Sequence, residues 1–198
     1  MTREEILKLF KQSEALLEGH FQLTSGLHSP QYFQCAKVLQ FPQNARLLCA
    51  EIAGNFRSAN AGLVVSPALG GIVVGQEVGR QLGLRTIFAE RKDGMMQLRR
   101  GFDIAKDERV LVCEDVITTG GSVREVVEVA KKKGGIIVGV GVIVDRSGGK
   151  VSFENLFATM RMEVITYNPE ECPFCKQGVP VEKPGSRPTV GAGPSPVA

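Results

Sequence analysis

Residues 110–133 restrict the fold more than any other part of the chain, because an apolar run passes through two acids and a glycine-rich loop into an amphipathic segment. The run Val110–Cys113 is typical of a strand buried on both faces. Four apolar side chains then share one helical face: Val123, Val126, Val127 and Ala130. Three lysines complement the carboxyl end of this helix, and Gly134 is suited to end it. The pattern predicts a strand–loop–helix unit with its helix at about 123–133.

The same alternation of apolar runs and helical periodicity recurs on both sides of this unit. Further strands are predicted at four apolar runs: 63–65, 86–89, 136–144 and 162–166. Helices are predicted at three segments: about 6–17 (ended by Gly19), 42–56 (opened by Pro42) and a segment that ends at about Leu82. Residues 21–34 are expected to be extended or a hairpin, with turns at Ser25-Gly26 and Ser29-Pro30. Residues 90–101 are expected to form a polar loop. The pattern indicates an α/β fold with a mostly parallel central sheet flanked by helices.

Length and charge set broad limits. The 198 residues, 43% of them apolar, fit a single domain at 1–183, followed by a Pro-, Gly- and Ser-rich tail at 184–198 that we expect to be disordered. A net charge of +3 is too small to indicate a nucleic-acid partner. No apolar run approaches the ~20 residues of a membrane span, and the charged, amphipathic start is unlike a signal peptide. We therefore expect neither a nucleic-acid nor a membrane partner.

The cysteines predict a reducing environment. They number five, an odd count, and most lie in apolar segments, as expected for free thiols in a cytoplasmic protein. Cys172 and Cys175 form a Cys-x-x-Cys pair, but a closed tetrahedral zinc site needs two more ligands. The two histidines, His20 and His28, lie far upstream. We therefore favour a turn with two thiols over a zinc site, and expect no metal to be held by protein side chains.

The side chains suited to bind a ligand follow the predicted strand Val110–Cys113 at its carboxyl end. Glu114 and Asp115 are delivered to the edge of the sheet where ligands bind in open α/β folds. The loop 118–122 follows, and its small residues and hydroxyls are suited to an anion beside a helix amino terminus. A ribose 5-phosphate satisfies both features, because its hydroxyls suit the acids and its phosphate suits the loop. The alternative is an ordinary strand–turn–helix with a Thr or Ser cap.

Residues 110–122 resemble the ribose-phosphate-binding motif of type I phosphoribosyltransferases, and over about 1–187 the chain is similar to the orotate branch of that family. The supporting segments are 23–26 with 29–30, 66–71, 90–92, 98–102 and 144–146. The first motif is specific for the family, whereas the others separate the orotate branch only in combination. The resemblance implies a type I phosphoribosyltransferase-like fold with a small N-terminal hood at about 1–40 and a core at about 41–170.

The resemblance also implies a site for 5-phosphoribosyl 1-pyrophosphate. Its ribose 5-phosphate would contact one continuous segment: Glu114, Asp115, Val116, Ile117, Thr118, Thr119, Gly120, Gly121 and Ser122. Its pyrophosphate would lie against the loop residues and basic pair Ala68, Leu69, Gly70, Arg91 and Lys92. Thr118 and Arg146 match the orotate end. The bland alternatives are a linking turn at 66–71, a solvated charge pair at 91–92 and a local Asp145–Arg146 ion pair.

Three departures from the family pattern affect the catalytic residues. Family members carry Lys where this chain has Thr24, and another Lys where Leu69-Gly70 stands. Their mobile loop has further Lys and His, whereas 92–101 reads Lys-Asp-Gly-Met-Met-Gln-Leu-Arg-Arg-Gly. Roles of the missing residues are not transferable. We expect Arg99 and Arg100 to join Lys92 and Asp115 as catalytic residues, with a surface role as the alternative, and His28 is a candidate neighbour of the base.

The resemblance implies transfer of a 5-phosphoribosyl group to orotate in pyrimidine biosynthesis, with Mg²⁺ held mainly by the substrate. It also implies a cytoplasmic homodimer. Two alternatives stay open: a phosphoribosyltransferase for a purine or another base, and a nucleotide-sensing regulator without turnover.

Overall fold

The computed structural model describes residues 1–23 and 25–184. Thr24 and the predicted tail from 185 onward lie outside the described residues. The helices are α1 Arg3–Gln12, α2 Cys35–Leu39, α3 Pro42–Phe56, α4 Gly70–Leu82, α5 Gly121–Lys132 and α6 Pro173–Lys176. The strands are β1 Leu16–Gln22, β2 His28–Phe33, β3 Leu63–Pro67, β4 Arg85–Lys92, β5 Met95–Leu98, β6 Arg109–Ile117, β7 Ile136–Asp145 and β8 Leu156–Arg161. None of the helices described is long and apolar enough to cross a membrane.

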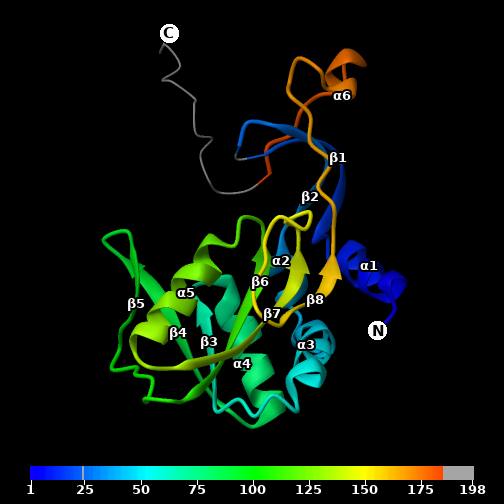
Figure 1. Ribbon diagram of the computed structural model, residues 1–198. Coiled ribbons are helices and arrows are strands. Elements are labelled where there is room, and N and C mark those ends of the chain that lie inside the picture. The colour runs from blue at the N-terminus through cyan, green and yellow to red at the C-terminus, as the bar shows by residue number, and fades with distance from the viewer. Residues whose placement is uncertain (24, 185–198) are drawn as a thin grey trace.

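A six-stranded sheet in the order β5-β4-β3-β6-β7-β8 forms the centre of the molecule. All neighbouring strands are parallel except β5, which is antiparallel to β4. Helices α3 and α4 cover one face and α5 covers the other (Figure 1). The buried strands read as apolar runs because both faces are covered. The prediction of a mostly parallel α/β sheet flanked by helices is confirmed.

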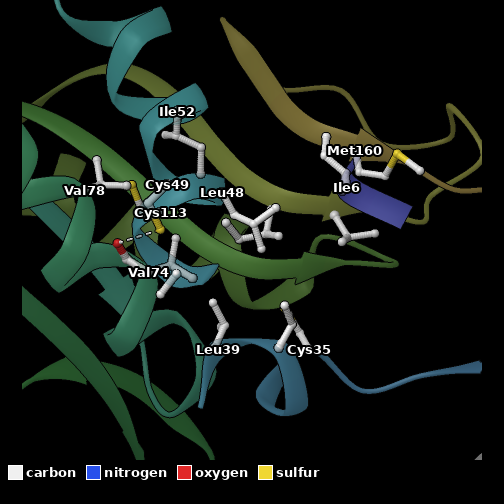
Figure 2. Packing of buried hydrophobic residues seen from close by; sticks show 14 of the residues in the cluster. Ile6, Cys35, Leu39, Leu48, Cys49, Ile52, Val74, Val78, Cys113 and Met160 are labelled. Carbon is white, nitrogen blue, oxygen red and sulfur yellow. Dashed lines mark hydrogen bonds between the residues drawn. The ribbon is translucent and has the colours of Figure 1, made fainter. Parts of the chain in front are cut away.

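The core on the α3–α4 side contains three of the five cysteines (Figure 2). Leu48 and Ile52 of α3 face Val74 of α4 across this layer, and all three are fully buried. The Cys49 thiol donates to the carbonyl of Val74 at 3.9 Å, and burial raises its pKa to about 12. A thiol in this environment stays protonated and acts as a small apolar group.

The N-terminal hood differs from its prediction. Helix α1 ends at Gln12, because Glu14 takes a positive φ of 54° and the Ala15 backbone N–H donates to the carbonyl of Phe10. The predicted helix end at about 17 is therefore wrong, and the apolar residues from Leu16 onward belong to β1. Strand β1 pairs with β2 as an antiparallel hairpin, which confirms the hairpin prediction. Ser29-Pro30 lies inside β2 and is not a turn.

Two other segments differ at the edges of the sheet. The last strand is β8, Leu156–Arg161, and the predicted strand at 162–166 is wrong. The expected polar loop at 90–101 is partly a hairpin, since β4 continues to Lys92 and pairs with β5. Asp93 and Gly94 form its two-residue turn, both with positive φ, as type I′ turns require.

Candidate functional site

The order of strands fixes where a ligand site can form. From β3 the chain moves outward to β4, and then returns to the other side of β3 to build β6, β7 and β8. The reversal lies between β3 and β6, whose following helices α4 and α5 cover opposite faces (Figure 1). Strands β3 and β6 pair only as far as Val65 and Val112, so their carboxyl ends separate. Ligands of open α/β sheets bind in the crevice at such a reversal.

Two predicted site segments meet in this crevice. A Cβ added at Gly70 would lie 2.3 Å from Oδ2 of Asp115, and one at Gly71 would lie 2.8 Å from Oε1 of Glu114. Only glycine permits so close an approach between the amino end of α4 and the two carboxylates. The structure therefore brings the predicted pyrophosphate loop against the predicted ribose acids. Whether the turn at 66–71 binds pyrophosphate or only links a strand to a helix stays a prediction.

The two acids share an unusual electrostatic environment. The Asp115 backbone N–H donates to Glu114 Oε1 at 3.0 Å, and the Val116 N–H donates to Asp115 Oδ1 at 2.8 Å. Burial, and secondly the charge of Asp115, raise the pKa of Glu114 from 4.5 to about 9. No lysine or arginine forms a salt bridge with either acid within residues 1–23 and 25–184. Hydroxyl donors or a cation would compensate these carboxylates.

The loop after β6 leads into α5 without a side-chain cap. Gly120 is the N-cap at φ +73°, and a Cβ there would lie 2.8 Å from the Val151 side chain. No side chain of the described residues makes a capping hydrogen bond at this end of α5. The alternative of a Thr or Ser cap is therefore wrong. The free N–H groups of the first turn and the positive end of the helix dipole suit an anion.

The basic candidates lie on β4 and just after β5. Arg91 pairs with Glu125 of α5 at 2.7 Å, and Lys92 is exposed at the end of β4. Arg99 and Arg100 both approach Glu90, at 3.6 and 3.0 Å. The three arginines thus pair with Glu125 or Glu90, and the structure does not bring Arg99 or Arg100 to the Glu114–Asp115 pair.

Arg146 follows β7 and lies beside the acid-bearing strand. Its backbone N–H donates to the carbonyl of Ile117 at 2.8 Å, and its guanidinium lies 6.0 Å from the ring centre of Phe33 in β2. Burial lowers the pKa of its guanidinium, and its Nε has no hydrogen-bond partner in the described part of the chain. The alternative of an Asp145–Arg146 ion pair is wrong, because Asp145 pairs with Arg161 at 3.7 Å. Arg146 thus contacts both the hood and the crevice strand, and its Nε is left to donate to a ligand.

His28 is not placed as a neighbour of the base. Its ring faces His20 and Cys175, in a group that also includes Cys172. The prediction that the two histidines lie too far from the Cys-x-x-Cys pair to share a site with it is wrong. The chain returns to the hood after β8, and this return has no signature in the local sequence pattern.

Comparison with known proteins agrees with this geometry. Residues 37–166 match the phosphoribosyl transferase domain. Orotate phosphoribosyltransferase from Chlorobaculum parvum is 60% identical over 188 residues, which cover 94% of this chain and 97% of that protein. The enzyme of the same name from Pelotomaculum thermopropionicum is 57% identical, over 94% of this chain and 99% of its own length.

A solved structure gives the same result for the fold. The crystal structure of orotate phosphoribosyltransferase from Aeropyrum pernix superposes with a TM-score of 0.65 at 25% identity, covering 79% of this chain and 93% of that one. The family match extends over the sheet and the loops 66–71 and 118–122, and the relatives match almost the whole chain. The chain therefore belongs to the phosphoribosyltransferase family, in its orotate phosphoribosyltransferase branch.

Proposed function

We propose that the protein transfers the 5-phosphoribosyl group of 5-phosphoribosyl 1-pyrophosphate to orotate, giving orotidine 5-phosphate and pyrophosphate. The observation that carries the proposal is the approach of Gly70 and Gly71 to the Asp115 and Glu114 carboxylates. A substrate with a pyrophosphate and a ribose on adjacent atoms suits a loop and an acid pair in such proximity. The names of relatives at 57% and 60% identity support orotate as the base.

The ribose 5-phosphate would be bound by β6 and the loop after it. The carboxylates of Glu114 and Asp115 would accept hydrogen bonds from the 2- and 3-hydroxyls. The segment 118–122 would hold the phosphate through backbone N–H groups at the start of α5. The raised pKa of Glu114 supports this assignment, because the unliganded acid pair lacks compensation that hydroxyls or a cation would supply.

Mg²⁺ fits the same place. Carboxylate and phosphate oxygens are its preferred ligands, and the acid pair offers such oxygens beside the pyrophosphate loop. The substrate oxygens would hold most of its coordination sphere, with Glu114 and Asp115 beside it. The ion would supply positive charge against the pyrophosphate leaving group.

The leaving group and the base would be held from opposite ends. The loop 68–70, with Arg91 and Lys92, would bind the pyrophosphate, and Arg99 and Arg100 would add charge if the β4–β5 hairpin moves over the site. At the other end Arg146, whose Nε lacks a partner among the described residues, would bind the orotate carboxylate beside Thr118.

The reaction needs positioning more than a protein nucleophile. The bond between C1 of the ribose and the pyrophosphate oxygen breaks as the bond between C1 and the orotate nitrogen forms. The electron pair leaves with pyrophosphate, and the proton of that nitrogen is released to pyrophosphate or water. The sugar ring oxygen delocalises the positive charge of the transition state, so bound donors and cations carry the catalysis. We extend the proposal to a cytoplasmic homodimer, as the family resemblance implies.

Measurement of pyrophosphate release from 5-phosphoribosyl 1-pyrophosphate tests the proposal. Orotate with Mg²⁺ is expected to give turnover, whereas uracil, adenine and hypoxanthine give little. Excess chelator is expected to abolish the reaction, and added Mg²⁺ to restore it. Preference for a purine would overturn the assignment of the base, and binding without turnover for any base would favour a regulator.

A further inference from the structure

Four metal-ligating side chains meet at the far end of the hood, outside the proposed catalytic crevice. They are His20, His28, Cys172 and Cys175, and their ligand atoms all lie within 4.8 Å of one another. His20 Nε2 lies 2.9 Å from His28 Nδ1 and 3.4 Å from the Cys172 sulfur. The Cys175 sulfur lies 3.3 Å from His28 Nδ1 and 3.7 Å from His20 Nε2. The ligand atoms of two thiols and two imidazoles thus lie close enough together to share one metal ion.

A β-bulge in the hairpin places His20 and His28 on the same face. Near the hairpin base Glu18 pairs with Gln31, and beyond it Phe21 pairs with Ser29, so the register shifts by one residue between them. In the unshifted register Phe21 would share a face with His28. With the shift, His20 and His28 share that face, since Gln22 lies directly opposite His28. The extra residue therefore places both rings on one side.

The cysteines come from a segment that has no apolar core of its own. Cys172 is the N-cap of α6 and Cys175 lies inside this short helix. From 163 to 184, Cys172 is the only buried residue. Figure 1 shows α6 at the outer end of the hood, away from the central sheet. A segment without its own apolar core usually needs a cross-link, and this one has free thiols in place of a disulfide.

The ring of His20 is already oriented as a metal ligand. Its Nδ1 lies 2.8 Å from the carbonyl of Val179, so Nδ1 carries the proton and donates, which leaves Nε2 with a free lone pair. A backbone carbonyl behind a ligating histidine is the usual outer partner in metal sites. Phe174 stacks on the same ring at 5.5 Å between ring centres. The imidazole is therefore held by groups that a ligand on Nε2 would not displace.

We propose that these four residues bind a structural zinc ion. Tetrahedral zinc with N and S ligands separates its ligand atoms by ~3.4 Å for two nitrogens and ~3.6 Å for nitrogen and sulfur. The N···S distances of 3.3 to 3.7 Å fit this geometry, and the N···N distance of 2.9 Å needs a small expansion. Two thiolates balance the charge of Zn²⁺, and a Cys₂His₂ set leaves no position open for substrate. The site is structural.

The zinc ion ties the C-terminal segment to the hood. His28 already exchanges two backbone hydrogen bonds with Tyr167, at 2.9 and 2.8 Å. On the other edge of the hairpin, Gln22 donates to Glu182 and Glu182 donates to His20, both at 2.8 Å. The ion lies between these two attachments, and together the three form a clamp around the hairpin. This inference does not depend on the proposed reaction, because no ligand belongs to the catalytic crevice.

Metal analysis of the full-length protein, purified without chelator and with any affinity tag removed, tests the proposal. One zinc per chain is expected. Cys175→Ser is expected to lower the zinc content at least ~tenfold, because a thiolate ligand is lost while its exposed position spares the core. Cys35→Ala is the matched control, since it removes a thiol outside the cluster, and it is expected to keep full zinc content.

Two further measurements keep the test decisive if the variant folds poorly. Wild-type protein reconstituted with Co²⁺ is expected to give the intense visible bands of tetrahedral coordination with thiolate charge transfer. Chelation is expected to speed hydrogen exchange in 16–33 and 167–182, and to leave the central sheet unchanged. The proposal is overturned by zinc-free wild-type protein, by a Cys172–Cys175 disulfide in freshly purified protein, or by zinc that Cys175→Ser retains.

Discussion

Replacing Gly70 by alanine tests whether the contact between the 68–71 loop and Asp115 serves catalysis. The added Cβ would lie 2.3 Å from Asp115 Oδ2, whereas an ordinary contact begins at 3.4 Å. The carboxylate or the loop must therefore retreat by about 1.1 Å. A displacement of ~1 Å in a site that works by positioning costs on the order of a hundredfold. We expect kcat/KM for 5-phosphoribosyl 1-pyrophosphate to fall by roughly that factor.

Stability should change much less than activity. Asp115 is half-buried at the crevice, so its carboxylate has room to turn away, and we expect a loss of at most ~1 kcal/mol. Gly54→Ala in α3 is the matched control, because its added Cβ meets nothing within 4 Å. This control should keep wild-type kinetics and gain up to ~1 kcal/mol from helix propensity.

The assay combines steady-state pyrophosphate release with thermal melting of each variant. Kinetics are measured at a temperature where all three proteins are folded, so that a loss of activity reports the site. Wild-type kcat/KM in Gly70→Ala would refute the reasoning, because the loop and the acid would then act independently. An equal loss in the Gly54→Ala control would refute it as well.

Three more predictions concern the two acids of the crevice and the arginines after β5. Asp115→Asn is expected to lower turnover at least ~tenfold with the fold intact, and the control Asp107→Asn on the exposed surface is expected to change nothing. If Asp115→Asn matched wild type in steady-state assays, Asp115 would not bind the ribose. Glu114 keeps its proton in the folded state up to a pKa of about 9 but releases it near 4.5 when unfolded, so wild-type stability should decline between these values as pH rises. Melting curves across that window should show Glu114→Gln gaining on wild type toward high pH, and parallel curves would contradict the assigned burial. At least one of Arg99→Ala and Arg100→Ala should lower kcat by roughly a hundredfold with little change in melting temperature. If the hairpin serves a neighbouring subunit, that variant should regain activity when it is mixed with Asp115→Asn. Two near-normal variants would leave these arginines as partners of an acid on their own surface.

Local patterns predicted the parts of the fold that are built locally. The strand, acids, loop and helix of 110–133 lie within one βα unit, so their apolar periodicity sufficed to predict β6 and α5. The Asp93-Gly94 turn was also readable, because Asp-Gly is a strong hairpin signal, but the charged residues around it suggested a loop. At the last strand two neighbouring apolar runs competed, and pairing with β7 selected 156–161 over 162–166.

The site was predictable where a local motif or a general rule of sheet topology places its residues. The meeting of Gly70 with Asp115 follows from the general rule that parallel strands present their carboxyl ends together. The group around His20 follows from no such rule. It requires a one-residue bulge in β1 and a chain that comes back to the hairpin, and neither leaves a periodic signal.

The clamp around the hairpin also dictates when the hood can form during synthesis. Val179, the carbonyl partner of His20, lies 159 residues further along the chain, and Cys175 lies 147 residues after His28. The hairpin therefore leaves the ribosome long before its partners exist, whereas each βα unit of the sheet closes over a short stretch. Contacts of such long sequence separation form late, because closing a long loop costs entropy before the contacts that offset it can form. The hairpin is thus translated before the sheet, yet it belongs to the last part of the molecule to be completed.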